Sequence, residues 1–137
     1  MRMLKVFVYG TLKPFESNYQ RFCAGKVVEE KKAQARGHLF ALPFGYPAMT
    51  LGDGRVKGYL LTFAEEEVLD NLDLLEDYDQ ERLAEQNEYN RQLIKTFNIS
   101  GEPLETAWAY LMSPDRVRRI GGILLPSGWW SGCSRSA

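Results

Sequence analysis

The sequence has little cysteine and histidine: Cys23, Cys133 and His38 are the only ones among 137 residues. Two cysteines form neither a disulfide framework nor a zinc motif, and one histidine cannot supply a multi-histidine metal site. A serine or cysteine triad would depend on His38, which begins an expected strand and is interpreted as structural. The composition therefore gives no support for a metal site or a thiol nucleophile, and it fits a reducing cytoplasm.

The sequence also lacks a long hydrophobic run. No apolar stretch reaches the roughly 20 residues that cross a bilayer, and the apolar N-terminal run is interrupted by charge and followed by no small-residue cleavage site. We expect a soluble, cytoplasmic protein with no membrane partner. Because repeats and linkers are absent, residues 1–137 are predicted to form one globular domain, with a mobile tail at about 131–137.

Charge is distributed unevenly behind a net charge of -1. Eleven of the 18 acidic residues lie between positions 64 and 90 beside a single base, Arg82, so this segment carries -10 and the rest carries +9. The remaining bases are scattered, without interleaved aromatic residues, and we expect no nucleic-acid partner. The acidic segment is open to three interpretations: a solvated face, a cation site, or the setting for one catalytic carboxylate.

Short apolar runs bounded by glycine and proline predict five strands, at residues 4–9, 37–42, 56–63, 89–99 and 106–112. Helices are expected at 17–25, with a serine cap, in the acidic segment, and at 114–121. Few long helices separate the strands, which predicts an α+β fold: a small mixed or antiparallel β-barrel flanked by two or three helices. Gly58, inside a strand, indicates a bulge or a close backbone approach.

The acidic helix is expected to be amphipathic. Thr62 and Glu65 have the spacing of a capping box at its start. Val68, Leu72 and Leu75 form its apolar stripe. The residues expected on the solvated face are Glu66, Glu67, Asp70, Asp73 and Asp77.

Glu76 is the exception, because it lies roughly 50° from the centre of the apolar stripe. Burial and neighbouring acids both raise a carboxyl pKa, so Glu76 is a candidate for proton transfer near neutral pH. The helical wheel leaves two alternatives open: Glu76 bends outward to solvent, or it pairs with Arg91 or Arg55.

A glycine turn, Tyr9-Gly10-Thr11-Leu12, follows the first strand. Glycine lets the backbone turn sharply and present consecutive amides, which can hold a carboxylate or an oxyanion. Turns of this kind most often have only a structural role, so the motif alone does not assign a function.

Seven short motifs occur in a fixed order: residues 6–12, Asn18, and residues 45–48, 56–60, 72–78, 89–91 and 107–110. Together they resemble the gamma-glutamylcyclotransferase-like family, which includes gamma-glutamylamine cyclotransferase and plant avirulence-induced-gene proteins. The resemblance implies a small β-barrel flanked by helices, with a cavity at the barrel mouth.

The resemblance also implies roles for residues. Tyr9, Gly10, Thr11 and Leu12 would bind the gamma-glutamyl group of a small-molecule amide, and Glu76 would be the catalytic proton acceptor. The reaction would yield 5-oxoproline and an amine or amino acid, with no metal or organic cofactor. Two alternatives remain: a non-catalytic metabolite-binding or regulatory module, and release of a gamma-glutamyl protecting group from a biosynthetic intermediate.

This chain departs from the family pattern at two places. Asp77 stands where the family usually has glycine, and residues 79–88 form a longer, more polar link. Both departures bear on the substrate more than on the reaction. Tyr89, Arg91 and Tyr110 are candidate substrate contacts that are kept outside the predicted site, because Tyr89 and Arg91 share one strand face, where they can pack and pair. Trp129 and Trp130 either cover a core edge, which is the favoured interpretation, or close the cavity.

Overall fold

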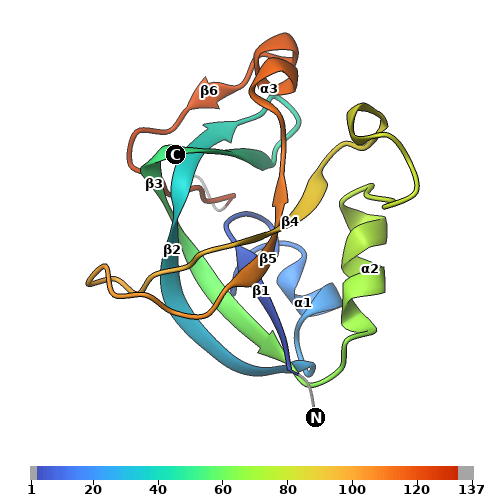
Figure 1. Ribbon diagram of the computed structural model, residues 1–137, viewed down its shortest axis with the longest axis vertical. Helices are drawn as coiled ribbons and strands as arrows, with labels where there is room; N and C mark the ends of the chain where they lie inside the picture. Colours follow the sequence, from blue (N-terminus) through green and yellow to red (C-terminus); the bar gives the residue numbers. More distant parts are fainter. Residues whose placement is uncertain (1–2, 133–137) are drawn as a thin grey trace.

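The computed structural model describes residues 3–132. Its elements, in chain order, are β1 (Leu4–Val8), α1 (Tyr19–Phe22), β2 (Val27–Ala41), β3 (Pro47–Phe63), α2 (Val68–Leu75), the 3₁₀ turn η1 (Ala84–Gln86), β4 (Asn90–Ile94), β5 (Ala107–Leu111), α3 (Pro114–Ile120) and β6 (Ile123–Leu124) (Figure 1). The expected mobility of residues 133–137, and the prediction for Cys133, lie outside the described residues.

The strands form one six-stranded sheet in the order β4-β5-β1-β3-β2-β6. All neighbours are antiparallel except β1 and β5, which run parallel. The sheet curls into a half-barrel, with α1 and α2 together beside it and α3 next to β6 (Figure 1). The predicted α+β fold, a mixed sheet flanked by helices, is confirmed.

Two predicted strands are much longer than expected. The strands predicted at 37–42 and 56–63 are parts of β2 and β3, which pair from Val27↔Phe63 to Ala41↔Pro47. Residues 29–32 are Glu-Glu-Lys-Lys and give no apolar pattern. Backbone pairing with β3, rather than side-chain burial, therefore holds this half of β2 in the sheet.

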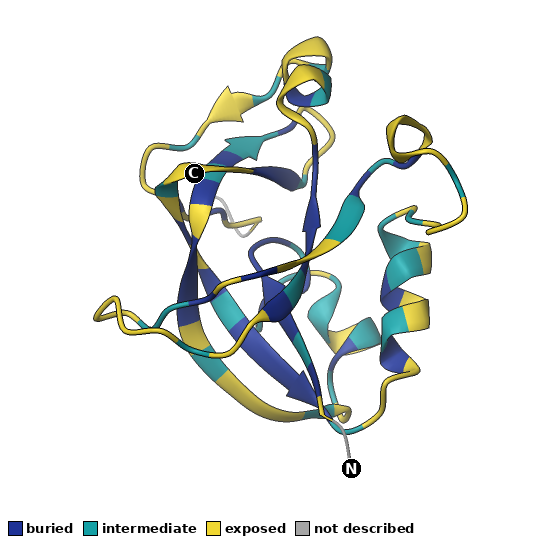
Figure 2. Ribbon diagram, viewed as in Figure 1, coloured by how far each residue is buried: buried dark blue, intermediate teal, exposed yellow. Residues whose placement is uncertain are grey.

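The apolar residues of β1 are buried on both faces of the sheet (Figure 2). The helix α2 covers one face, and the curl of the sheet encloses the other. Leu4, Val6 and Val8 belong to the core shared with Val68 and Leu72 of α2. Phe7 and Tyr9 belong to a second core inside the curl, which also contains buried Trp130. Burial on both faces explains why β1 is apolar at every position except Lys5.

Both predicted helix starts near the site are wrong in detail. Thr62 remains in β3, where its hydroxyl accepts a hydrogen bond from Lys5 Nζ at 2.9 Å, so the Thr62–Glu65 capping box does not form. Instead α2 begins after Glu67, without a side-chain cap. Likewise α1 follows Asn18 rather than a serine cap at Ser17. For Thr62, pairing within the β-sheet therefore outweighs the tendency of a threonine to cap a helix.

Other local predictions are confirmed. The helix predicted at 114–121 is α3, which starts at a Ser113 cap that accepts from the Arg116 backbone N–H at 3.2 Å. The strand predicted at 89–99 is β4, although it ends at Ile94. A Cβ at Gly58 would lie 2.1 Å from the Val8 carbonyl oxygen, which is the close backbone approach predicted there. His38 lies in β2, with its Nε2 3.3 Å from Oδ1 of Asp53 in β3.

No helix within residues 3–132 is long and apolar enough to cross a bilayer. In the same part of the chain, no group of three or more His, Cys, Asp or Glu residues is arranged to hold a metal ion.

Candidate active site

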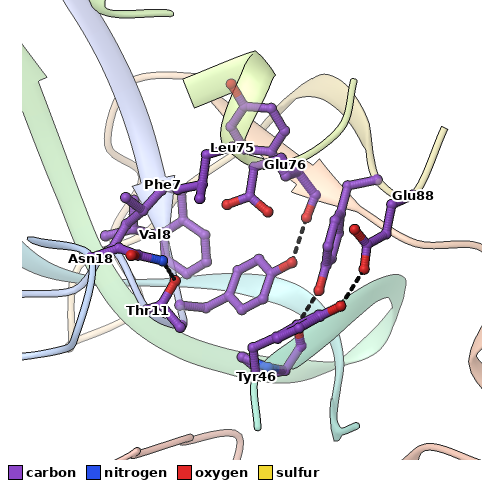
Figure 3. A pocket seen from close by; sticks show the side chains of 14 residues that line it. Phe7, Val8, Thr11, Asn18, Tyr46, Leu75, Glu76 and Glu88 are labelled. Carbon is purple, nitrogen blue, oxygen red and sulfur yellow. Dashed lines mark hydrogen bonds between the residues drawn. The ribbon is translucent and has the colours of Figure 1, made fainter. Parts of the chain in front are cut away.

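A cavity of about 330 Å³ opens where β1 ends and α2 ends (Figure 3). This volume is at the lower end of the range of small-molecule sites. The residues that line it come from six separate segments: Phe7, Val8, Tyr9, Gly10, Thr11, Leu12, Asn18, Tyr46, Pro47, Leu75, Glu76, Glu88, Tyr89 and Tyr110.

All five predicted site residues line this cavity. Tyr9, Gly10, Thr11 and Leu12 follow β1, and Glu76 follows α2, more than sixty residues later. They meet because β1 is an inner strand of the sheet and α2 packs against it through Val68 and Leu72. The sheet and the helix thus bring the turn and the carboxylate to opposite walls of one pocket.

The turn after β1 is held by its own hydrogen bonds and by close packing. The Asn18 side-chain amide donates to Thr11 Oγ1 at 2.8 Å, and the Asn18 backbone N–H donates to the Thr11 carbonyl at 2.8 Å. A Cβ at Gly10 would lie 2.7 Å from Pro47 Cγ, so only glycine fits there without displacing Pro47.

The turn presents donors to the cavity. Within residues 3–132, the backbone N–H groups of Thr11 and Leu12 make no hydrogen bond to another protein group. Because the Thr11 hydroxyl oxygen already accepts from Asn18, its own proton remains available to a ligand. This wall can therefore hold an anionic group.

Glu76 points into the cavity (Figure 3). Its backbone N–H donates to the Leu72 carbonyl at 3.0 Å and closes the last turn of α2. In the described part of the chain its carboxylate makes no hydrogen bond or ion pair. Of the two alternatives left open, outward bending is excluded, and Arg91 pairs with Asp73 instead, at 3.5 Å.

Two physical effects raise the pKa of Glu76 from 4.5 to about 8. The larger is desolvation, because protein atoms surround the carboxyl group and only the cavity itself gives it access to solvent. The second is repulsion from the Glu88 carboxylate, which lines the same cavity. Glu76 is thus a carboxyl group that exchanges a proton near neutral pH.

Two tyrosines fix the floor of the cavity. The Tyr9 hydroxyl donates to the Tyr110 carbonyl at 2.5 Å, and the Tyr89 hydroxyl donates to the Pro47 carbonyl at 2.6 Å. Burial raises the pKa of both groups well above the ordinary value for tyrosine, so both keep their protons. Their oxygens can still accept hydrogen bonds from a ligand.

Tyr110 links the cavity to an ion pair behind it. Its hydroxyl donates to Asp73 Oδ1 at 2.7 Å, and the Arg91 guanidinium lies over the rings of Tyr78 and Trp108, at 5.2 and 4.5 Å. Arg91 therefore packs and pairs as predicted. The prediction that Asp73 lies on the solvated face of α2 is wrong, because its side chain is half-buried against the sheet.

Sequence reasoning did not place nine of the fourteen lining residues in the site, and these include three tyrosines and one carboxylate: Tyr46, Tyr89, Tyr110 and Glu88. Tyr89 and Tyr110 were kept outside the predicted site; both are buried, and both line the cavity. Spacing along a strand predicts burial, but it does not distinguish a side chain in the core from one that lines a cavity. Trp130, in contrast, has the predicted packing role.

Both departures from the family pattern lie beside the cavity. Asp77 has a φ of 56°, in the left-handed region that favours glycine. Arg82 Nη2 donates to Asp77 Oδ1 at 3.2 Å, which holds this second carboxylate outside the cavity. The longer link of residues 79–88 brings Glu88 to the rim.

Comparisons with known proteins agree with the geometry. The family model "Gamma-glutamyl cyclotransferase, AIG2-like" matches residues 6–132. A Vibrio cholerae protein named "Putative gamma-glutamylcyclotransferase" is 32% identical over 130 residues, covering 95% of this chain and 96% of that protein.

Two solved structures share the fold at lower identity. An AIG2-like protein from Mus musculus has a TM-score of 0.69 at 18% identity, covering 96% of this chain and 90% of its own. YkqA from Bacillus subtilis has a TM-score of 0.66 at 23% identity over 94% of this chain, which spans 40% of that longer protein.

Proposed function

The chain belongs to the gamma-glutamyl cyclotransferase, AIG2-like family, and we propose that it cyclises the gamma-glutamyl group of a small-molecule amide to 5-oxoproline, releasing an amine or an amino acid. The observation that carries this proposal is the Glu76 carboxylate, which has no partner within residues 3–132 and points into a cavity that also contains the donor turn after β1.

The two walls of the cavity suit the two ends of an α-amino acid. The Thr11 and Leu12 amides and the Thr11 hydroxyl are donors for an α-carboxylate or a developing oxyanion. Glu76 and the oxygens of Tyr9 and Tyr89 are acceptors for an α-ammonium. A gamma-glutamyl group carries both charges on one carbon.

In the proposed mechanism Glu76 takes a proton from the α-ammonium of the substrate. The freed amine attacks the gamma-carbonyl carbon of the same molecule, a carbon–nitrogen bond forms, and the carbonyl oxygen becomes an oxyanion that faces donors of the turn. The tetrahedral intermediate then collapses: the bond to the leaving nitrogen breaks as Glu76 returns its proton to that nitrogen. The ring nitrogen still carries one proton more than the lactam does, and Glu76 passes this proton on to the departing amine. The products are 5-oxoproline and the released amine in its ammonium form.

A carboxyl pKa of about 8 suits this task, because a base is most effective when its pKa approaches those of the groups that exchange the proton. Ring closure within one molecule needs only orientation, which a shaped cavity supplies. The scheme uses no metal or organic cofactor, and a cytoplasmic location remains a prediction from the sequence.

Replacing Glu76 with glutamine tests the proposal. We expect 5-oxoproline release from at least one member of a panel of gamma-glutamyl amino acids, gamma-glutamyl amines and glutathione. Glu76→Gln should lower kcat at least a hundredfold, because the amide cannot accept the proton. The matched control is Asp77→Asn, which removes the adjacent charge outside the cavity and should keep most of the activity.

Retained turnover in Glu76→Gln would contradict the mechanism. A protein that binds 5-oxoproline in the cavity but turns over none of the panel would instead be the metabolite-binding module.

A further inference from the structure

Lys13, the residue after the turn that follows β1, is a buried cation that the proposed chemistry does not use. Its side chain is 1% exposed, and lysine is rarely buried to this degree without partners. Its Nζ donates to the Trp130 carbonyl, lies 3.4 Å from Glu16 Oε2 and lies 4.0 Å from the centre of the Trp129 ring. The fold therefore keeps a compensated cation in a place that an apolar side chain of similar volume could fill.

The backbone of Lys13 closes the turn after β1. Its N–H donates to the Gly10 carbonyl at 3.0 Å, so residues 10–13 form a β-turn with Thr11 and Leu12 at the two central positions. These two residues carry the amides that the turn presents to the cavity. The direction of both amides therefore depends on where Lys13 is held.

The segment of residues 128–132, here called the strap, runs past the Lys13 side chain. At one end of the strap, the Gly128 carbonyl accepts from the backbone N–H of Lys57 in β3 at 2.7 Å. At the other end, the Gly132 backbone N–H donates to Glu16 Oε1 at 3.1 Å. The strap thus joins β3 to the chain that follows the turn.

Lys13 connects the strap to the turn, because its backbone belongs to the turn and its Nζ binds the carbonyl of Trp130, 117 residues later. Its side chain does not line the cavity, so it acts on a ligand through the turn. We propose that Lys13 is a positioning residue, which the strap and Glu16 hold so that the Thr11 and Leu12 amides point at the anionic group of the ligand. This inference rests on the proposed function, which supplies that anion as an α-carboxylate or an oxyanion.

Glu16 distinguishes a positioning role of Lys13 from a direct effect of its charge. Glu16→Ala removes the acceptor of the Gly132 N–H and leaves the Lys13 cation with one neutralising acid fewer. If the Lys13 charge attracted the anion directly, this variant would bind the anion more tightly. If Lys13 holds the turn in place, the variant should bind the anion less tightly, because one contact between the strap and the chain after the turn is lost.

The test compares two ligands that differ by one charge: 5-oxoproline, which carries a carboxylate, and its neutral amide, 5-oxoprolinamide. By calorimetry, the unmodified protein should bind 5-oxoproline about tenfold or more tightly than the amide, as for charge-assisted hydrogen bonds to the turn. Lys13→Met keeps the length of the side chain but not its donor, and it should bring this ratio close to one. Glu16→Ala should give an intermediate ratio, and the affinity for the neutral amide should stay nearly unchanged in both variants.

Val117→Ala is the matched control for stability. Val117 is buried in α3 and does not line the cavity, so its truncation should lower the thermal midpoint and leave the ratio of the unmodified protein intact. Kinetics provides a second readout. On any amide that is turned over, Lys13→Met should lower kcat/KM about tenfold through misplaced donors, while the midpoint of the pH profile, which Glu76 sets, stays where it is.

The same ratio in Lys13→Met and in the unmodified protein would overturn the proposal. A ratio that stays the same or rises in Glu16→Ala overturns it as well, and this variant decides the matter if Lys13→Met does not fold. A ratio near one in the unmodified protein, including no measurable binding of either ligand, also overturns it, because the turn then selects no anion. If no gamma-glutamyl amide is turned over but the ratio falls in both variants, Lys13 holds the turn and the proposed reaction is wrong.

Discussion

At the scale of single residues, Glu76 differs from the other acids of the acidic segment in its surroundings. Glu66, Glu67 and Asp70 are exposed, and Asp77 is paired with Arg82. Only Glu76 combines an enclosed carboxyl group with a cavity and with a neighbouring acid. The helical wheel identified this residue because one turn of helix places it beside the apolar stripe.

The pH dependence of the reaction follows from the raised pKa of Glu76. A general base must be ionised, so log kcat/KM should rise by about one per pH unit below pH 8 and level off above it. In Glu88→Gln the midpoint should move to lower pH, because a repelling charge is gone. Rates measured from pH 5 to 9.5 check this, and a rate that falls as pH rises through 8 would exclude Glu76 as the base.

At the scale of elements, the end of α2 directs the Glu76 side chain into the cavity. The helix ends at Leu75 with Glu76 as its C-cap, and the next residue, Asp77, has a left-handed φ of 56° that turns the chain away. Arg82 Nη2 donates to the Asp77 carbonyl at 2.9 Å. The turn after β1 is held by a different device, the close packing of Gly10 against Pro47.

Replacing Asp77 with valine should damage both stability and activity. A β-branched residue is strained in the left-handed region, so we expect a loss of about 1 to 2 kcal/mol in the free energy of unfolding. Because the strain falls next to Glu76, kcat should fall as well. Urea denaturation and steady-state kinetics measure both effects, with Asp77→Asn as the control, since asparagine tolerates this conformation. Equal behaviour of the two variants would refute the role of the helix end.

At the scale of the whole molecule, the cavity exists because distant segments converge on it. Parallel pairing sets β5 beside β1, which places Tyr110 behind Tyr9, and the hairpin of β2 and β3 brings Tyr46 and Pro47 across from the turn. This arrangement destabilises the fold when Glu76 is ionised, because its carboxyl group is poorly solvated.

That cost makes stability depend on pH. The unfolded chain releases the Glu76 proton above about pH 4.5, whereas the folded chain retains it until about pH 8. Folded Glu76 therefore lowers the free energy of unfolding as pH rises across this window, by an amount on the order of 2 to 4 kcal/mol. Glu76→Gln should be more stable than the unmodified protein at pH 9 and nearly equal at pH 4.5. Denaturant titrations at both pH values test this, and a less stable variant at pH 9 would contradict it.

The sequence determined the parts that depend on local pattern. The strand β1, the short helix α3 and the apolar stripe of α2 were all predicted from residue spacing. Glu76 was predicted from its place beside the apolar stripe of α2, and the turn at residues 9–12 was assigned to the site through the family resemblance; both line the cavity.

Only the tertiary structure decided which residues share the cavity. The charged half of β2 has no apolar period, so pairing with β3 rather than spacing extends it, and Thr62 follows its ladder instead of its capping preference. Tyr110 and Glu88 reach the cavity through strand pairing and through the anchored 79–88 link. Contacts between residues far apart in the chain depend on how elements pack, and one-dimensional spacing carries no record of that packing.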